Sequence, residues 1–190
     1  NFENVLFNLK EIISSGKVRQ IGISNENPWA FMKYLELSKK KLPKTITIQN
    51  PYSLLNRLFE IGNSEICMRE DVGLLAYSPL GFGVLSGKYL NGNMPEDSRL
   101  KLFPNLSRFS GKNSMKATSM YYNISKKYNL SLTQMALSFV NSRPFVTSNI
   151  IGATKLNQLK ENIESINIDL SEDALKEINE VHKLIPNPAP

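Results

Sequence analysis

The stretch Gly73-Leu74-Leu75-Ala76-Tyr77 decides the fold, and a turn of small and apolar residues, Ser78 to Gly83, follows it directly. The stretch is short and nearly continuous in apolar residues. Runs of this length and character are typical of strands that other elements cover on both faces, as in parallel sheets. It therefore predicts a buried strand of an α/β protein, with a loop at the carboxyl end of the strand.

Three more strands are predicted around it, over Val18–Ser24, Thr45–Gln49 and Val146–Ile151. Helical patterns lie between and beside the strands, and four have a recognisable cap at the start: Asn27 before Pro28, Ser131 with Gln134, Thr154, and Ser171. Three further helices are predicted, from the first residue to about Gly16, around Ser64–Arg69 and over Ser114–Tyr128. Strands that alternate with helices predict a parallel sheet of βα units, and 190 residues suit one domain, residues 1–190, with no separate second domain.

Three segments lack such signals. No capping residue precedes Asn1, so the first helix is predicted to begin without a cap. The long polar stretch from the end of the Ser78–Gly83 turn to about Lys112 is predicted to be a loop and a functional insertion. The proline-rich segment Ile185–Pro190 is predicted to be irregular.

Composition restricts the class of protein. With 41% hydrophobic residues and a mean hydropathy of -0.26, the chain is expected to be soluble and globular. The formal net charge is +6, but the lysines are scattered, so a solvated basic face is favoured over a nucleic-acid surface. No apolar run reaches the ~18 residues of a membrane helix, and the first residues do not resemble a signal peptide. We therefore expect a cytoplasmic protein that binds neither nucleic acid nor membrane.

The chain has one cysteine and one histidine. Cys67 excludes an internal disulfide, and its interpretation as a small apolar residue is favoured over a nucleophile. His182 lies near the far end of the sequence, and packing is favoured as its role. A single histidine makes a histidine-rich metal site unexpected, so no metal is predicted.

Polar residues stand where the predicted strands end, which is where parallel sheets hold their ligands. Ser24, Asn25 and Gln49 offer hydroxyl and amide groups suited to a planar carboxamide, and Tyr77 offers a flat face for stacking. For any one of them, capping of the following helix is the favoured alternative. Together they favour a ligand.

A phosphate-bearing ligand is predicted across the third and fourth strand ends. The Ser78–Gly83 turn exposes backbone N–H groups, and Thr154 opens a helix whose N-terminus attracts anions. Lys88 and Lys155 lie close to these positions in sequence. Neither turn is specific alone, and the sequence has no G-x-G-x-x-G or P-loop motif.

Four ordered motifs resemble the C-terminal half of an aldo-keto reductase, and the resemblance spans essentially the whole chain. The motifs are Gly16-Lys17-Val18-Arg19-Gln20-Ile21-Gly22-Ile23-Ser24-Asn25, Ala76-Tyr77-Ser78-Pro79-Leu80-Gly81, Gly87-Lys88-Tyr89, and Gly152-Ala153-Thr154 with Gln158-Leu159-Lys160-Glu161-Asn162. The run Gln49-Asn50-Pro51-Tyr52-Ser53-Leu54-Leu55-Asn56-Arg57 resembles the Tas-like bacterial branch of that family.

The resemblance implies strands 5–8 of a TIM (β/α)8 barrel that binds NADPH (NADP+) and reduces aldehydes or ketones. It implies that Ser24, Asn25 and Gln49 hold the nicotinamide carboxamide while Tyr77 stacks on the ring. Further cofactor contacts are implied for the pyrophosphate, at Ser78, Leu80, Phe82 and Lys88, and for the adenosine and its 2′-phosphate, at Gly152, Ala153, Thr154, Gln158, Glu161 and Asn162. Arg99 is a possible further contact, with Arg108 as the competing choice.

The catalytic Asp, Tyr, Lys and His of the family belong to strands that have no counterpart in this sequence, so no catalytic residue is assigned. Whether the chain alone is an enzyme therefore stays open, although the resemblance implies an NADP-dependent oxidoreductase. The implied partners are a small carbonyl substrate and a missing N-terminal half-barrel. The alternative is a non-catalytic NADP(H)-binding or regulatory half-barrel module. The choice of NADPH over NADH also stays open, because Gln158 stands where an arginine would be diagnostic.

Overall fold

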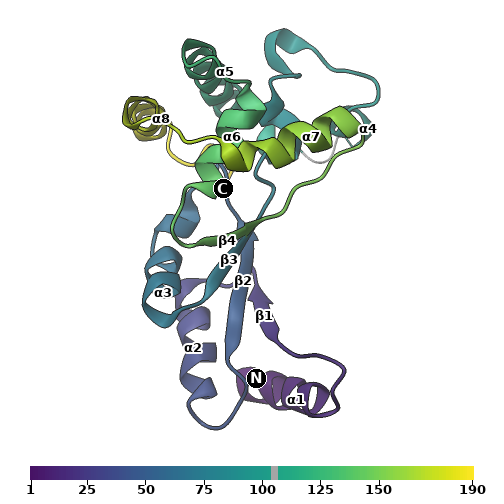
Figure 1. Cartoon of the computed structure of the whole chain (residues 1–190), viewed down its shortest axis with the longest axis vertical. Coiled ribbons are helices and arrows are strands. Elements are labelled where there is room, and N and C mark those ends of the chain that lie inside the picture. The colour runs from purple at the N-terminus through teal and green to yellow at the C-terminus, as the bar shows by residue number, and fades with distance from the viewer. Residues whose placement is uncertain (104–106) are drawn as a thin grey trace. The chain divides into compact units, whose positions relative to one another are not determined.

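A computed structural model describes residues 1–103 and 107–190 of the chain. The described residues form an α/β structure with one sheet of four strands in the order β1-β2-β3-β4 (Figure 1). The strands are β1 Ile21–Ser24, β2 Thr45–Pro51, β3 Gly73–Tyr77 and β4 Val146–Asn149. The helices are α1 Phe2–Ser14, α2 Pro28–Ser38, α3 Asn63–Glu70, α4 Arg99–Leu102, α5 Lys112–Lys127, α6 Leu132–Asn141, α7 Leu156–Glu164 and α8 Glu172–Leu184.

The four predicted strands are confirmed, with β3 at the predicted bounds. β1 pairs with β2 in parallel, and Ile21 lies opposite Thr45, the first residue of β2. The prediction that β1 begins at Val18 is therefore wrong, because the residues before Ile21 have no strand partner. β4 ends two residues earlier than predicted, at Asn149, although the Ile150 N–H still donates to the Ala76 carbonyl at 2.8 Å.

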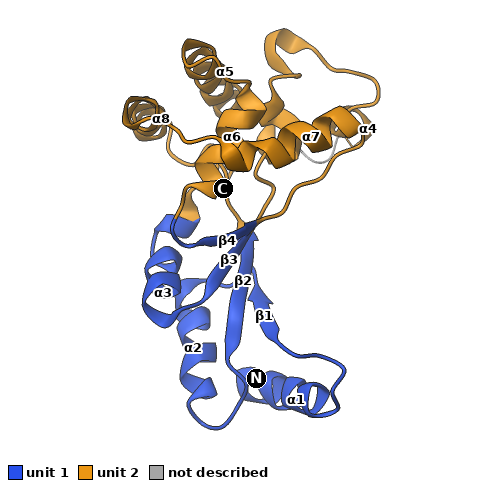
Figure 2. Ribbon diagram, in the orientation of Figure 1, with its two compact units in different colours: residues 1–50, 59–75, 144–148 blue, residues 51–58, 76–143, 149–190 orange. Residues whose placement is uncertain are grey.

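The chain divides into two compact units, coloured blue and orange in Figure 2. The first unit comprises residues 1–50, 59–75 and 144–148, and the second comprises 51–58, 76–143 and 149–190. The first unit contains α1 to α3 and β1, and the second contains α4 to α8. Strands β2, β3 and β4 each begin in the first unit and end in the second.

In the first unit, α1 and α2 pack around β1. A cluster of buried side chains joins these elements, made of Leu6, Ile21, Tyr34 and Leu37. The prediction that α1 lacks a cap is wrong, because the Asn1 Oδ1 accepts a hydrogen bond from the Glu3 N–H at 3.0 Å. The predicted cap of α2 is confirmed, since the Asn27 Oδ1 accepts from the Ala30 N–H at 2.9 Å.

In the second unit, α6 is almost wholly buried and lies beside α7, while α5 lies beside α8 (Figure 1). The capping box at the start of α6 is confirmed by hydrogen bonds between Ser131 and Gln134 in both directions, each 3.0 Å long. The stretch from Val84 to about Lys112, predicted to be a loop, contains short 3₁₀ turns and the one-turn helix α4; residues 104–106 of that stretch lie outside the described residues.

The start of α7 differs from the prediction. The N-cap is Lys155 and not Thr154, and the Thr154 hydroxyl donates to the Gln158 Oε1 at 3.2 Å. The apolar side chains Leu156, Leu159 and Ile163 of this helix are exposed. Among the described residues, no helix combines the length and the apolar character needed to cross a membrane.

A polar cluster joins α5 to α8 and predicts how stability depends on pH. Lys127 Nζ and Tyr128 Oη donate to one oxygen of Glu177, at 2.6 and 2.8 Å. These hydrogen bonds, from Lys127 first and Tyr128 second, lower the pKa of the Glu177 carboxyl. Its contribution to stability is fully present above the unfolded pKa of a glutamate, about 4.3, and is lost as the pH falls through the lower folded-state pKa.

Glu177→Gln should therefore weaken the acid dependence of stability. We expect urea unfolding at neutral pH and at pH values below the usual glutamate pKa to differ less in this variant than in the unaltered chain. Tyr128→Phe is the matched control, because it keeps the ion pair between Lys127 and Glu177 and removes one hydrogen bond. The acid dependence of its stability should lie between those of Glu177→Gln and the unaltered chain. Identical acid dependence of Glu177→Gln and the unaltered chain would contradict the assignment.

Candidate cofactor site

The predicted carboxamide-binding residues form one hydrogen-bonded cluster in the first unit. The Ser24 hydroxyl donates to the Gln49 carbonyl at 2.9 Å, and the Asn25 side-chain amide donates to the Ser24 Oγ at 3.1 Å. The Asn25 backbone N–H lies 3.0 Å from the Gln49 carbonyl and 2.9 Å from the Asn50 Oδ1. The structure thus brings Ser24, Asn25 and Gln49 together at the carboxyl ends of β1 and β2.

This cluster presents polar groups to solvent. Ser24, Asn25 and Gln49 are all exposed. Asn25 has a φ of 58°, a left-handed conformation that asparagine tolerates better than most residues, and it turns the chain out of β1. Side-chain amides both donate and accept hydrogen bonds, so the cluster suits a ligand group that does the same.

In the second unit, Tyr77 ends β3 and leads into a tightly wound turn. Four residues of the Ser78–Gly83 turn have left-handed backbone conformations: Ser78, Gly81, Phe82 and Gly83. The turn is closed by backbone bonds from the Gly81 N–H to the Ser78 carbonyl and from the Gly83 N–H to the Leu80 carbonyl, both 2.9 Å. A left-handed residue after a right-handed one makes a concave group of backbone N–H groups that favours anions, and Gly81 follows Leu80, whose φ is -99°, in this way.

The side chain of Lys88 lies against this turn. A methyl group added at Gly83 would lie 3.2 Å from the Lys88 Nζ, so the missing side chain at Gly83 makes room for the ammonium group. The same ammonium group lies 5.2 Å from the centre of the Tyr89 ring. The structure therefore brings Lys88 together with the turn that the sequence predicts to contact a pyrophosphate.

Arg99 stacks on the predicted turn residue Phe82, with the guanidinium carbon 4.4 Å from the ring centre. Phe82 in turn meets the Phe109 ring edge to face, at 4.8 Å between centres. Arg108 lies over Phe109 instead, at 5.4 Å. Of the two arginines considered from the sequence, Arg99 is thus the one that contacts a predicted cofactor residue.

The residues predicted around the start of α7 hold one another in place. Gln158 Oε1 accepts from the Thr154 and Lys155 N–H groups at 3.1 and 3.2 Å. Asn162 is buried and its side chain donates to the Gly152 carbonyl at 3.3 Å, while Glu161 accepts from the Ser131 hydroxyl at 2.5 Å. Gln158 therefore caps a helix, and Glu161 and Asn162 also have structural roles. The exposed residues of this group are Gly152, Ala153 and Thr154.

Sequence reasoning missed Asp97. Its carboxylate lies 3.4 Å from the Lys155 Nζ and so connects the long segment after β3 to the start of α7. No local pattern marks Asp97 in the sequence, because its partner is far along the chain.

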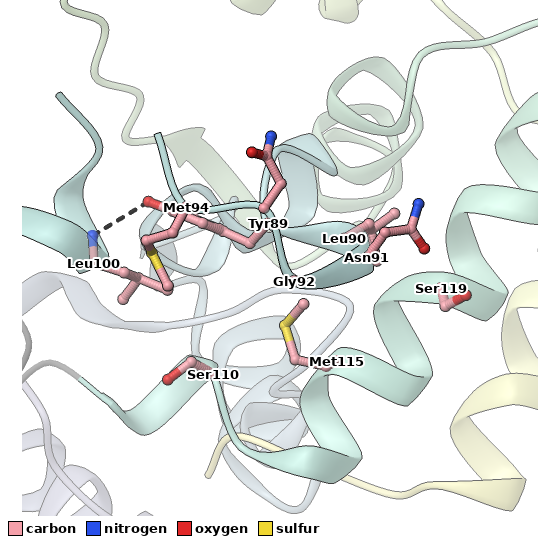
Figure 3. Close-up of a pocket in the computed structure, with 10 residues that line it drawn as sticks. Tyr89, Leu90, Asn91, Gly92, Met94, Leu100, Ser110, Met115 and Ser119 are labelled. Carbon is pink, nitrogen blue, oxygen red and sulfur yellow. Dashed lines mark hydrogen bonds between the residues drawn. The ribbon is translucent and has the colours of Figure 1, made fainter. Parts of the chain in front are cut away.

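A separate cavity of about 410 Å³ lies within the second unit (Figure 3). Its walls include Tyr89, Met94, Leu100 and Met115, and the Leu100 N–H donates to the Tyr89 hydroxyl at 3.2 Å (Figure 3). None of the predicted cofactor residues lines it. The predicted cofactor residues therefore lie outside the lining of this cavity.

The lone cysteine has the expected environment. Cys67 is buried on α3, and burial raises the pKa of its thiol to about 12. The thiol therefore stays protonated near neutral pH and is a poor nucleophile. Across residues 1–103 and 107–190, no three histidine, cysteine or acidic side chains gather where they could hold a metal ion.

The family model for the aldo/keto reductase family matches residues 1–183. The chain belongs to the aldo/keto reductase family. This aldo/keto reductase chain is 51% identical to the protein Tas of Escherichia coli over 183 residues, which are 96% of the chain and 53% of Tas. The Tas-like branch inferred from the Gln49–Arg57 run is thereby confirmed.

Two other relatives are more distant. An aldo-keto reductase of Babesia bovis is 37% identical over 95% of this chain and 66% of its own length. The L-glyceraldehyde 3-phosphate reductase of Escherichia coli O157:H7 is 34% identical over 90% of this chain and 51% of its own length. The aldo/keto reductase chain thus spans about half the length of Tas and of this last relative.

Proposed function

We propose that this chain supplies most of the NADPH site of an aldo/keto reductase that reduces an aldehyde or ketone. The observation that supports it most is the cluster of Ser24, Asn25 and Gln49 at the ends of two neighbouring parallel strands. Exposed amide and hydroxyl groups there fit a nicotinamide carboxamide, which has one carbonyl and one NH₂ group to satisfy. When bound, NADPH supplies the hydride that reduces the carbonyl carbon.

In this proposal the residues of the chain bind the cofactor and orient its nicotinamide ring. In the proposal, Ser24, Asn25 and Gln49 fix the carboxamide, and Tyr77 covers one face of the ring, so that only the other face meets the substrate. The turn with Ser78, Leu80 and Phe82 offers backbone N–H groups to the pyrophosphate, and Lys88 adds positive charge. The segment Gly152–Thr154 is exposed next to a helix start, where a 2′-phosphate is favoured. We assign no proton transfer to this chain.

We further propose that the chain forms strands 5–8 of a (β/α)8 barrel and that a second half-barrel completes it. The matched region is 53% of Tas, which leaves room in a whole protein of that length for the other strands. An exposed apolar stripe on α7, made of Leu156, Leu159 and Ile163, supports a covering partner, because such stripes normally pack against another element. The catalytic groups and much of the carbonyl pocket belong to that partner in the proposal.

The test replaces the matched region of Escherichia coli Tas with residues 1–183 of this chain. The hybrid protein is expected to bind NADPH and to consume it when simple aldehydes and ketones are supplied. The matched control is a hybrid with Ser24→Ala and Gln49→Ala, which should bind NADPH more weakly. A folded hybrid that binds no NADPH would refute the proposal, whereas binding without turnover of any carbonyl would favour the non-catalytic module.

A further inference from the structure

The run Tyr52–Arg57, which follows β2, is buried at every position, although it is neither helix nor strand. Buried loops are uncommon, because their backbone N–H and carbonyl groups lose water and need other partners. Three hydrogen bonds lie within the run: the Ser53 N–H donates to the Asn56 carbonyl at 3.0 Å, the Asn56 N–H donates to the Ser53 carbonyl at 3.1 Å, and the Leu55 N–H donates to the Ser53 Oγ at 3.2 Å. Several other groups of the run have partners elsewhere in the second unit.

Residues 187–189 supply two of these partners. The Asn187 Oδ1 accepts a hydrogen bond from the Arg57 N–H at 2.7 Å. The Ala189 N–H donates to the Leu55 carbonyl at 3.1 Å, and Ala189 is fully buried. A third partner is the Tyr121 hydroxyl, which donates to the Leu54 carbonyl at 3.1 Å.

The proline-rich segment is itself fixed. The Pro188 carbonyl accepts from the Ser114 hydroxyl at 2.9 Å, close to the start of α5. Asn187 has a φ of 45°, a left-handed conformation that asparagine adopts more readily than most residues. The prediction that this segment is irregular is confirmed, and the segment is bonded to the buried run at Asn187 and Ala189.

The buried run also touches the predicted cofactor site. The Tyr52 N–H donates to the Tyr77 carbonyl at 3.2 Å, so the first residue of the run is bonded to the last residue of β3. Tyr77 is the residue that the proposed function places against the nicotinamide ring. Asn187 and Tyr77 are thus joined through hydrogen bonds and a short length of buried backbone.

We infer that Asn187 is a positioning residue for the end of β3. Its side chain fixes the Tyr52–Arg57 run through the Arg57 N–H, and the run fixes the Tyr77 backbone through the Tyr52 N–H. The Tyr77 ring is thereby kept where stacking on the nicotinamide requires it. The Tyr52–Arg57 part of the Tas-like run therefore has a role in cofactor binding without contacting the cofactor. The link to NADPH rests on the proposed function, whereas the hold on the run can be measured without any ligand.

The experiment compares Asn187→Gly with Asn187→Asp in the whole chain. Glycine keeps the left-handed backbone and removes the acceptor, whereas aspartate keeps both the acceptor and the tolerance of this conformation. Hydrogen exchange at the Arg57 and Tyr52 N–H groups is measured, together with the Kd for NADPH. For Asn187→Gly we expect exchange roughly tenfold faster at Arg57, faster exchange at Tyr52, and roughly threefold weaker NADPH binding. In Asn187→Asp, the two exchange rates and the Kd for NADPH should stay near the values of the unaltered chain.

The positioning role of Asn187 requires both faster exchange at Tyr52 and weaker NADPH binding in Asn187→Gly. Unchanged exchange at Tyr52 in Asn187→Gly overturns the inference, because the run would then hold Tyr77 without help from Asn187. Faster exchange at Tyr52 with unchanged affinity for NADPH also overturns it, since the contact would be structural only. If the unaltered chain binds no NADPH, the hybrid with Tas decides the proposed function, and faster Tyr52 exchange in Asn187→Gly that is absent from Asn187→Asp still supports the hold on β3.

Discussion

Gly22→Ala is expected to lower the free energy of unfolding by roughly 3 kcal/mol. A Cβ atom at this position would lie 2.9 Å from the Thr47 carbonyl oxygen and closer still to the Thr47 Oγ1. The carbonyl belongs to the backbone of β2 and cannot turn aside, so β1 would have to move away from its partner. Because β1 and β2 also hold Ser24 and Gln49, the change should disturb the carboxamide cluster as well.

Urea unfolding measures the loss, and two variants control it. Gly152→Ala adds a methyl group where nothing lies within 4 Å, so its effect should stay within about 0.5 kcal/mol. Thr47→Ala in the Gly22→Ala background removes the hydroxyl and leaves the carbonyl, so it should restore only part of the stability. If Gly22→Ala is as stable as Gly152→Ala, the close pairing of the two strands is not as described.

Most of the fold was predictable because its local rules agree with one another. The apolar run of β3, the Asn27-Pro28 start of α2 and the Ser131 capping box each depend on neighbours within a few residues, and the structure contains all three. Two errors are local, at the N-caps of α1 and α7, and another arises where a long-range pairing decides. β1 begins at Ile21, opposite the first residue of β2, and no local pattern in Val18–Ser24 shows this pairing.

The site was predictable to the extent that parallel strands end at one edge. That rule places Ser24 and Asn25 beside Gln49, as observed. It gives no information about contacts between distant loops, so neither the Asp97–Lys155 ion pair nor the binding of residues 187–189 to the Tyr52–Arg57 run could be predicted. A proline-rich segment has no hydrophobic periodicity that would predict where it packs. Its partners become clear only once the structure shows which buried backbone groups of the Tyr52–Arg57 run need hydrogen bonds.

Tyr77→Ala is expected to weaken NADPH binding by roughly 1 kcal/mol or more, which is about fivefold or more in Kd. The reason is the loss of the flat ring that the proposed function places against the nicotinamide. Tyr77 is only partly buried, and its carbonyl, which accepts from the Tyr52 N–H, is unchanged by the substitution. The end of β3 should therefore keep its backbone bond, and the effect should appear in affinity more than in stability.

Tyr77→Phe separates stacking from hydrogen bonding by the tyrosine hydroxyl. Phenylalanine keeps the ring face, so its affinity for NADPH, measured by fluorescence titration of the unaltered chain and both variants, should stay near the original value. If Tyr77→Ala binds NADPH with the affinity of the unaltered chain, Tyr77 does not belong to the cofactor site. A phenylalanine variant as weak as alanine would show that the hydroxyl binds the cofactor, which would move Tyr77 from covering the ring to holding a polar edge of the nucleotide. That change of role would also weaken the inference that Asn187 positions the end of β3 for cofactor binding. A hydrogen bond from a hydroxyl on a long side chain tolerates small shifts of the backbone that a stacked ring does not.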